Sequence, residues 1–228
     1  LTQANEHPRE TFMLSLLIKE KQFFQSGDLL AVQTKENGEE RMYSIGKGRS
    51  DEIVLYIKRH PRGWCSQYLS EQQLGNLVKG RIISNPKFHV PKKFKSLILI
   101  SNGTGIAPFM GMINENNHKG CIHLFWGGAS KDDYSLYESS LLVMKNEDKV
   151  RSVNTVFSEE GEGYVQELLS KNKELITKEL RAGACIMICG SLDMEKSVVS
   201  SLNKICQESR EKDMTYYKSK GRLKTDCY

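Results

Sequence analysis

The segment "SLILISNGTGIAPF", residues 96–109, decides the fold of this chain. Its first half is an apolar run without polar alternation, which predicts a strand buried on both faces of a parallel sheet. Two glycines one residue apart then permit a sharp turn and a close approach of a ligand to the backbone. Pro108 suits the first turn of a helix, where a missing N–H costs little. The segment therefore predicts a strand, a glycine turn and a helix whose start can bind a phosphate.

The glycine turn alone leaves two interpretations open. It is a phosphate site, or it is a tight strand-to-helix connection that binds nothing. It lacks the lysine of a Gly-x-x-x-x-Gly-Lys loop and the spacing of Gly-x-Gly-x-x-Gly. A nucleotide kinase and a simple Rossmann dehydrogenase therefore fit poorly.

The chain after residue 95 alternates apolar runs with helix-compatible stretches. Further apolar runs occupy residues 121–128, 152–158 and 184–190. Helix-compatible stretches occupy residues 107–116, 135–146, 164–180 and 194–209. This alternation predicts a Rossmann-like α/β domain with a parallel sheet over residues 95–228. The stretch "MTYYK", residues 214–218, can add a last strand.

The first 94 residues have a different rhythm. Short β-like segments separated by Gly, Asn or Ser occupy residues 27–35, 41–47, 51–59 and 80–85. Their spacing predicts a small antiparallel β-barrel domain over residues 1–94. A helical segment interrupts them at residues 66–78, and residues 88–94 form a connector.

The composition excludes several classes of function. Of 228 residues, 33 are basic and 28 acidic, and no dense basic block indicates nucleic-acid binding. The six cysteines form no Cys-x-x-Cys pair, which favours reduced thiols in a cytoplasmic protein without a metal site. No apolar run approaches the roughly 18 residues of a membrane span, and no signal peptide begins the chain. Because residue 1 is Leu, the sequence leaves open whether a segment precedes it. Such a segment could place the protein at the cytoplasmic face of a membrane.

Six strings in order resemble the ferredoxin–NADP reductase superfamily, and within it the reductase half of diflavin enzymes such as the sulfite reductase flavoprotein and microsomal cytochrome reductase. They are "RMYS" (41–44), "GWCS" (63–66), "GTGIAPF" (103–109), "YVQ" (164–166), "ICG" (188–190) and "KGRLKTDCY" (220–228). The resemblance extends from Gly27 to Tyr228. It implies an FAD-binding β-barrel followed by an NAD(P)-binding α/β domain.

The resemblance also implies roles for individual residues. The residues expected to bind FAD are Arg41, Tyr43, Ser44, Gly63, Trp64, Cys65, Ser66 and Tyr228. Those expected to bind the nicotinamide dinucleotide are Gly103, Thr104, Gly105, Ser158, Glu159, Tyr164, Gln166, Cys189, Gly190 and Met194. Those expected to serve hydride transfer are Ser44, Cys189, Asp226 and Tyr228, with Ser44 beside flavin N5 and Tyr228 stacked on the flavin. Taken singly, each has a structural alternative: a surface charge for Arg41, a buried thiol for Cys189, and a frayed terminus for Tyr228.

The chain departs from the pattern of NADPH users in this family. Glu159 stands where an Arg is expected, Glu162 stands two residues before Tyr164, and Ala129 replaces another Arg. A carboxylate repels a 2′-phosphate but can accept hydrogen bonds from a free ribose. These departures favour NADH slightly over NADPH. The alternative is that the glutamates point to solvent while Lys131 contacts the phosphate.

The leading prediction is an FAD-containing NAD(P)H reductase module that passes electrons to a separate acceptor. That acceptor is an FMN domain, a flavodoxin- or ferredoxin-like protein, or a haem or membrane partner, and it can lie upstream in the same polypeptide. A nucleotide-binding regulatory domain without redox activity is the alternative, favoured by the acidic loop at residues 159–163. A stand-alone dehydrogenase for a small substrate is a third reading, although no added catalytic constellation supports it.

Overall fold

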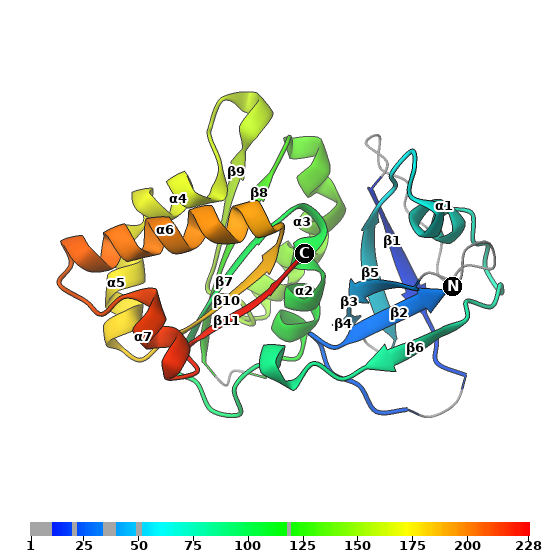
Figure 1. Cartoon of the computed structure of the whole chain (residues 1–228), viewed down its shortest axis with the longest axis horizontal. Helices are drawn as coiled ribbons and strands as arrows, with labels where there is room; N and C mark the ends of the chain where they lie inside the picture. Colours follow the sequence, from blue (N-terminus) through cyan, green and yellow to red (C-terminus); the bar gives the residue numbers. More distant parts are fainter. Residues whose placement is uncertain (1–10, 20–21, 34–39, 49–51, 118–119) are drawn as a thin grey trace. The chain divides into compact units, whose positions relative to one another are not determined.

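The computed structural model describes residues 11–19, 22–33, 40–48, 52–117 and 120–228. Contacts between residues divide the chain into two compact units (Figure 1). Unit 1 comprises Leu1–His89 with Ala107–Glu115, and unit 2 comprises Val90–Ile106 with Asn116–Tyr228. The division into functional domains at residues 1–94 and 95–228 stays a prediction. Within the described ranges, no helix is long and apolar enough to cross a membrane.

Unit 2 is built on a five-stranded parallel sheet, which confirms the prediction of a parallel α/β arrangement. Its strands, in spatial order, are β11 (Leu223–Cys227), β10 (Cys185–Gly190), β7 (Ser96–Asn102), β8 (Cys121–Gly128) and β9 (Ser152–Phe157). Each adjacent pair is parallel. The apolar runs lack alternation because helices cover both faces of such a sheet.

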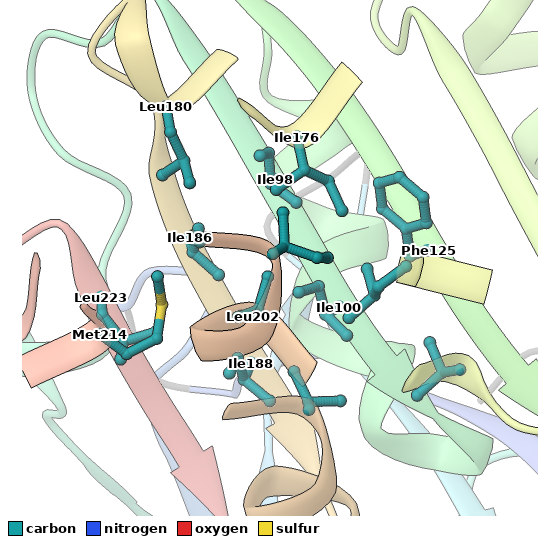
Figure 2. Close-up of a cluster of buried hydrophobic side chains, with 14 of the residues drawn as sticks. Ile98, Ile100, Phe125, Ile176, Leu180, Ile186, Ile188, Leu202, Met214 and Leu223 are labelled. Carbon is teal, nitrogen blue, oxygen red and sulfur yellow. The ribbon is translucent and has the colours of Figure 1, made fainter. Parts of the chain in front are cut away.

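One face of the sheet packs against helices α4 (Val165–Lys171), α5 (Lys173–Arg181), α6 (Leu192–Glu208) and α7 (Met214–Ser219). Figure 2 shows isoleucines of β7 and β10 meeting side chains of α5 and α6, including Ile176, Leu180 and Leu202. The opposite face carries Trp126 of β8. Its ring lies 5.5 Å from Tyr134 and 5.6 Å from Tyr137 of α3 (Lys131–Asn146).

Four expectations for unit 2 need correction, and the first two concern helices. Helix α3 begins at Lys131, not residue 135, because Ser130 and Asp133 form a reciprocal N-terminal cap. The stretch 164–180 is two helices rather than one, and they meet at Asn172, whose Nδ2 donates to the Leu168 carbonyl (2.8 Å). A polar side chain that bonds the backbone in this way competes with helix continuation, which periodicity does not reveal.

The expected last strand at residues 214–218 is wrong, since this stretch forms helix α7. The Asp213 carboxylate accepts a hydrogen bond from the Tyr216 N–H (2.8 Å) and caps the helix. The last strand is β11, which begins at Leu223 inside the terminal string. Helix α6 begins at Leu192, two residues before the expected start, with Ser191 as its N-cap.

Unit 1 contains two antiparallel three-stranded sheets, which agrees with the antiparallel part of the prediction. One has the order β1 (Thr11–Leu16), β5 (Ile53–Lys58), β4 (Gly46–Lys47), and the other has β3 (Glu40–Ser44), β2 (Leu29–Gln33), β6 (Gly80–Ile83). Strand β1 was not anticipated. Its residues Phe12 and Leu14 lie in the core with Leu55 of β5. The helical segment expected at 66–78 is shorter, because α1 spans only Trp64–Ser70.

Helix α2 (Ala107–Asn114) belongs to unit 1 by its contacts, although the glycine turn before it belongs to unit 2. Gly111 allows the helix to approach β4, since a Cβ there would collide with the Lys47 nitrogen and Ser26 Oγ. Just beyond the helix, Ser26 Oγ donates to the Glu115 carboxylate (2.8 Å). A short 3₁₀ turn η1 (Pro86–Phe88) precedes the connector, and its Phe88 ring lies 6.0 Å from the Phe109 ring of α2.

Candidate functional site

The order of strands in unit 2 creates a switch point between β7 and β10. From β7 the chain adds β8 and β9 on one side, then crosses to place β10 and β11 on the other. In doubly wound sheets, ligands bind beyond the carboxyl ends of the strands at this point. The 3₁₀ turn η2 (Gly103–Ile106) follows β7 here, and the turn from Gly190 into α6 follows β10.

The two glycines of the turn after β7 have different environments. Gly103 has φ +49°, and a Cβ there would have no heavy atom within 4 Å, so its surroundings are open. Gly105 packs against β10, because its Cβ would collide with the Cys189 carbonyl oxygen. The indole Nε1 of Trp126 donates to the Gly103 carbonyl (2.9 Å) and anchors the turn. One side of the turn is thus held against the sheet while Gly103 faces open space.

Three chemically distinct side chains occupy one row across the carboxyl end of the sheet. Cys189 pairs with Ser101 on β7 and with Asp226 on β11. Directly paired residues of parallel strands project from the same face, so the hydroxyl, thiol and carboxyl groups share that face. Ser101 Oγ is buried without a hydrogen-bond partner among the described residues. Cys189 is fully buried as well.

Tyr228 is attached to the glycine turn and to the end of β10. Its N–H donates to the Gly190 carbonyl (3.0 Å), and its phenol hydrogen-bonds the Thr104 side chain. Loss of hydration raises the pKa of Tyr228 to about 12, with Cys189 and then Asp226 acting in the same direction and Thr104 against it. Although 64% of the side chain is exposed, this contact holds the hydroxyl end. The phenol is therefore protonated at neutral pH.

Residues of the acidic loop after β9 make hydrogen bonds to Ala129, Lys131 and Phe157. It begins with the 3₁₀ turn η3 (Ser158–Glu160), where the Glu159 N–H donates to the Ala129 carbonyl (2.9 Å). Glu160 accepts from the Lys131 N–H (3.0 Å) and pairs with Lys131 Nζ (3.1 Å). The Phe157 N–H donates to the Glu162 carboxylate (3.1 Å). The hydrogen bond from the Lys131 N–H is the largest cause of the lowered pKa of Glu160, so this carboxylate is ionised at neutral pH.

The remaining predicted dinucleotide contacts divide into exposed and buried residues. Ser158 is half-buried and its Oγ is 3.4 Å from the Gly128 carbonyl. Tyr164 is 61% exposed at the start of α4, and Gln166 accepts from Ser201 Oγ through its backbone carbonyl (3.0 Å). Met194, in contrast, is buried in the core of unit 2. Its side chain is therefore part of the packing beneath α6.

In unit 1, the two strings expected to bind flavin meet. Tyr43 of β3 hydrogen-bonds Cys65 of α1, and Arg41 lies near the same thiol. Burial is the main cause that raises the pKa of Cys65, while Tyr43 and Arg41 act in the opposite direction. Arg41 is exposed and Ser44 is buried, so β3 presents a guanidinium at one end and an enclosed hydroxyl at the other.

The turn before α1 is tightly built. Ser66 Oγ donates to the Gly63 carbonyl (2.8 Å) and accepts from the His60 N–H (3.1 Å). A Cβ on Gly63 would lie 2.7 Å from Ser66 Oγ, which explains the glycine. Trp64 is 61% exposed beside this turn. The Ser66 hydroxyl thus shapes the turn, while the Trp64 ring and Arg41 are exposed.

The sequence did not identify four features of these clusters. They are Ser101, Asn102, the Thr104–Tyr228 hydrogen bond and the Lys131–Glu160 pair. Asn102 and Ser101 directly precede the glycine turn, so their position could have drawn attention. The other two depend on residues distant in sequence. Within the described ranges, no group of three or more His, Cys, Asp or Glu residues could hold a metal ion.

Comparison with known proteins supports the resemblance seen in the sequence. Residues 99–200 match the model of the oxidoreductase NAD-binding domain. The chain is 32% identical over 167 residues to NADPH-dependent diflavin oxidoreductase 1 of Kluyveromyces lactis, which covers 66% of this chain and 26% of that protein. It is 33% identical over 135 residues to NADPH oxidoreductase A of Dictyostelium discoideum, covering 56% of this chain and 21% of that protein.

A third relative matches nearly the whole chain. The sulfite reductase [NADPH] flavoprotein alpha-component of Photobacterium profundum is 24% identical over 252 residues, covering 99% of this chain and 41% of that protein. The chain thus spans only about a quarter of the first of these curated relatives and less than half of the others. Together with the parallel sheet and the strings that it positions, these matches confirm the resemblance to the ferredoxin–NADP reductase superfamily, and the chain is similar to the reductase half of diflavin reductases.

Proposed function

We propose that this chain is an FAD-dependent reductase module that oxidises a reduced nicotinamide dinucleotide and delivers electrons to a separate acceptor. The observation that carries the proposal is the row of Cys189 and Asp226 at the switch point, beside a Tyr228 held on Thr104. The three relatives described above are named as oxidoreductases that use NADPH. In this proposal, residues 1–94 form the FAD domain, with the two antiparallel sheets as parts of one β-barrel, and residues 95–228 bind the dinucleotide.

The groups present fit the proposed cofactors. The open space at Gly103 lets the backbone approach a dinucleotide, and the buried Ser101 hydroxyl offers an unused hydrogen bond in the same row as Cys189. For FAD, the planar guanidinium of Arg41 suits a diphosphate and the exposed Trp64 ring suits an adenine or flavin face. When bound, the flavin supplies the redox chemistry, receiving a hydride from the nicotinamide and releasing its electrons to the acceptor.

The protein's own residues would bind the two cofactors and orient their reacting rings. Asp226 and Cys189 would place the nicotinamide through polar contacts, and Ser44 would hydrogen-bond the flavin from a buried position. Tyr228 would cover the flavin face until a nicotinamide displaces it, with its phenol neutral throughout. Gly103 and Thr104 would receive the pyrophosphate at the glycine turn.

The test is reduction of the purified, FAD-supplemented protein by a nicotinamide dinucleotide. A flavin absorbance band and its bleaching in stopped flow would support the reductase. Protein that cannot be reconstituted with FAD but binds a dinucleotide would instead support a regulatory nucleotide-binding domain. Protein that binds neither would refute both functions.

For the dinucleotide, we propose a preference for NADH, against the names of the relatives. The support is the Lys131–Glu160 pair, because the cation that could grip a 2′-phosphate is already paired with an ionised carboxylate. Glu159, where a cation was expected, is exposed on the same turn. Steady-state kinetics with both dinucleotides tests this proposal, and a hundredfold advantage for NADPH would refute it.

A single substitution sharpens this test. Glu160→Gln releases Lys131, so we expect the ratio of kcat/KM for NADPH to that for NADH to rise about three- to tenfold, a modest change because the pair is solvent-exposed. Glu208→Gln is the matched control, since it breaks an equally short exposed pair with Lys173 (3.0 Å) on α5. An unchanged ratio in Glu160→Gln would contradict a role for this pair in selectivity.

We also propose a class of acceptor and a location for this chain. Because this chain spans less than half of the three relatives reported, we propose an acceptor domain or protein such as an FMN domain, flavodoxin or ferredoxin. No disulfide links the six cysteines, which suits the proposed cytoplasmic location. Electron delivery to flavodoxin, ferredoxin and cytochrome c, measured side by side, distinguishes the acceptors.

A further inference from the structure

The carboxamide of Asn102 joins the two turns that flank the switch point. Its Oδ1 accepts a hydrogen bond from the Ser191 N–H (3.1 Å), and its Nδ2 donates to Ser191 Oγ (3.3 Å). Both ends of one amide thus bind one residue that is 89 positions away in the sequence. Asn102 is the last residue of β7 and Ser191 directly follows β10. We call this pair of hydrogen bonds the Asn102–Ser191 clasp.

The clasp acts on the start of helix α6. Ser191 is the N-cap, and its Oγ also accepts from the Met194 N–H (3.3 Å). A hydroxyl oxygen can accept two hydrogen bonds, so the bond from Asn102 orients the same oxygen that caps the helix. The backbone carbonyl of Ser191 accepts from the Glu195 N–H (3.0 Å). Displacing Asn102 would therefore displace the first turn of α6.

The clasp also reaches the end of the chain through Gly190. This glycine has φ +149°, and a Cβ there would collide with Asn102 Oδ1 and lie 2.8 Å from Met194 Cε. Its carbonyl accepts from the Tyr228 N–H (3.0 Å). Asn102 therefore occupies the space that a side chain at residue 190 would need. Gly190 itself, at the end of β10, binds Tyr228 through its carbonyl.

On its other side, Asn102 leads directly into the glycine turn. Gly105 packs against β10, because a Cβ built on it would lie only 2.8 Å from the carbonyl carbon of Cys189. Around Gly103, in contrast, the space is open. The turn is thus held to β10 at two points, by the packing of Gly105 and by the clasp. Loosening the clasp would leave the turn held by the packing of Gly105 and by the bond from Trp126 Nε1 to the Gly103 carbonyl.

From this geometry we propose that Asn102 is a positioning residue for the dinucleotide. It keeps the glycine turn, the start of α6 and Tyr228 at one fixed spacing, so that N–H groups of both turns meet the ligand without rearrangement. Preorganisation of this kind improves affinity because the ordering cost is met before binding. The inference rests on the proposed dinucleotide site, and it goes beyond that site by assigning a residue that does not itself need to touch the ligand.

The expected kinetic effect of Asn102→Ala is on binding. We expect the KM for NADH and for NADPH to rise about tenfold in the FAD-loaded full chain, with kcat changed less than twofold, because the lost interaction supports ground state and transition state equally. Ser191→Ala keeps the N–H that donates to Asn102 but removes the Oγ that accepts from Asn102 and caps α6, so it should also raise KM. The effect of the double variant should fall short of the sum of the single effects, since both single variants remove the bond from Asn102 Nδ2 to Ser191 Oγ. Ser191→Thr keeps the hydroxyl and should recover most of the loss seen in Ser191→Ala.

A matched control separates positioning from general stability. Asn154→Ala removes a half-buried amide that makes two hydrogen bonds in the same sheet, to the Leu124 carbonyl (3.1 Å) and Ser152 Oγ (3.2 Å). It should lower the urea midpoint about as much as Asn102→Ala while leaving KM unchanged. An equal rise in KM in both variants would overturn the positioning role.

Amide hydrogen exchange tests the clasp without any ligand. In Asn102→Ala we expect the Ser191, Met194 and Tyr228 amides to exchange at least tenfold faster, while amides of β8 are unchanged. Unchanged exchange at Ser191 overturns the clasp, and accelerated exchange with an unchanged KM overturns its role in positioning. If the wild-type protein oxidises neither dinucleotide, the proposed function fails, and the exchange result still decides whether the clasp exists.

Discussion

At the scale of single residues, Asp28 is a buried carboxylate that organises the turn before β2. It accepts hydrogen bonds from the Gln25 N–H (2.9 Å), the Asn85 N–H (2.8 Å) and His89 Nε2 (2.6 Å). Burial is the largest single influence on its pKa and raises it, but the three hydrogen bonds together with the His89 charge lower the pKa by more. The ionised form of Asp28 is therefore the one that the folded unit 1 stabilises.

This balance predicts the pH dependence of stability. A folded-state pKa below the unfolded value, near 3.9, means that the stabilisation is present above that pH and is lost as the pH falls through the folded pKa. Asp28→Asn should lower the free energy of unfolding at pH 6 by about 1–3 kcal/mol and should flatten its decline below pH 4. Urea unfolding between pH 2.5 and 6 measures both effects. The exposed Asp132→Asn is the control, and an equally small loss in both variants would refute the role of Asp28.

A second prediction at this scale concerns the row at the switch point. If Cys189 orients the nicotinamide, Cys189→Ala should slow flavin reduction on the order of tenfold or more without reducing flavin content. Cys185 lies on the same strand and the same face, four residues further from the carboxyl end, so Cys185→Ala is the matched control. Stopped-flow rates at saturating dinucleotide measure the difference. Equal rates for the two variants would exclude a catalytic role of the Cys189 thiol.

At the scale of elements, the turn from β10 into α6 requires a glycine for two reasons. Gly190 has a positive φ and also lacks space for a Cβ, whereas Gly183 has φ +98° with nothing within 4 Å. Gly183→Ala should therefore destabilise the protein by about 1–2 kcal/mol through its backbone conformation alone. Gly190→Ala should cost clearly more, because Asn102 and Met194 must also move. The difference between the two variants in the free energy of unfolding, measured in urea, gives the cost of the crowding at residue 190. Equal losses of stability would argue against such a cost.

The same scale shows where periodicity succeeds and where it does not. Four of the five parallel strands, β7 to β10, were predicted within a residue or two because they coincide with apolar runs, whereas β11 was not predicted. Helix α7 was mistaken for a strand because "MTYYK" is rich in aromatic residues, while its real determinant is the cap from Asp213. The break at Asn172 likewise depends on one side chain bonding one carbonyl. Hydrophobic patterns report which face is buried, but they do not report such local hydrogen bonds.

At the scale of the whole molecule, the chain contains two tryptophans, one in each compact unit. Trp64 in unit 1 is 61% exposed and Trp126 in unit 2 is fully buried, so each reports on its own unit. Trp64→Phe leaves Trp126 as the reporter of unit 2, and subtraction from the wild type gives the signal of unit 1. FAD at a hundredfold excess over its Kd should stabilise unit 1 by about 2.7 kcal/mol.

The dinucleotide fragment ADP-ribose should instead raise the urea midpoint seen by Trp126. Urea titrations with each ligand, followed by tryptophan emission, check the assignment of FAD to one unit and the dinucleotide to the other. If FAD raised only the urea midpoint reported by Trp126, the assignment of FAD to unit 1 would be wrong.

The sequence by itself determined the resemblance to a family, the parallel sheet and the glycine turn, because these depend on runs of apolar residues and on residue types at short, fixed spacings. Only the tertiary structure brought Ser101, Cys189 and Asp226 into one row, joined Asn102 to Ser191, and paired Lys131 with Glu160. These contacts join residues from 29 to 89 positions apart, and strand register and helix starts decide them. The physical reason is that a hydrogen bond needs its two atoms within about 3 Å, and only the packed sheet brings distant parts of the chain that close.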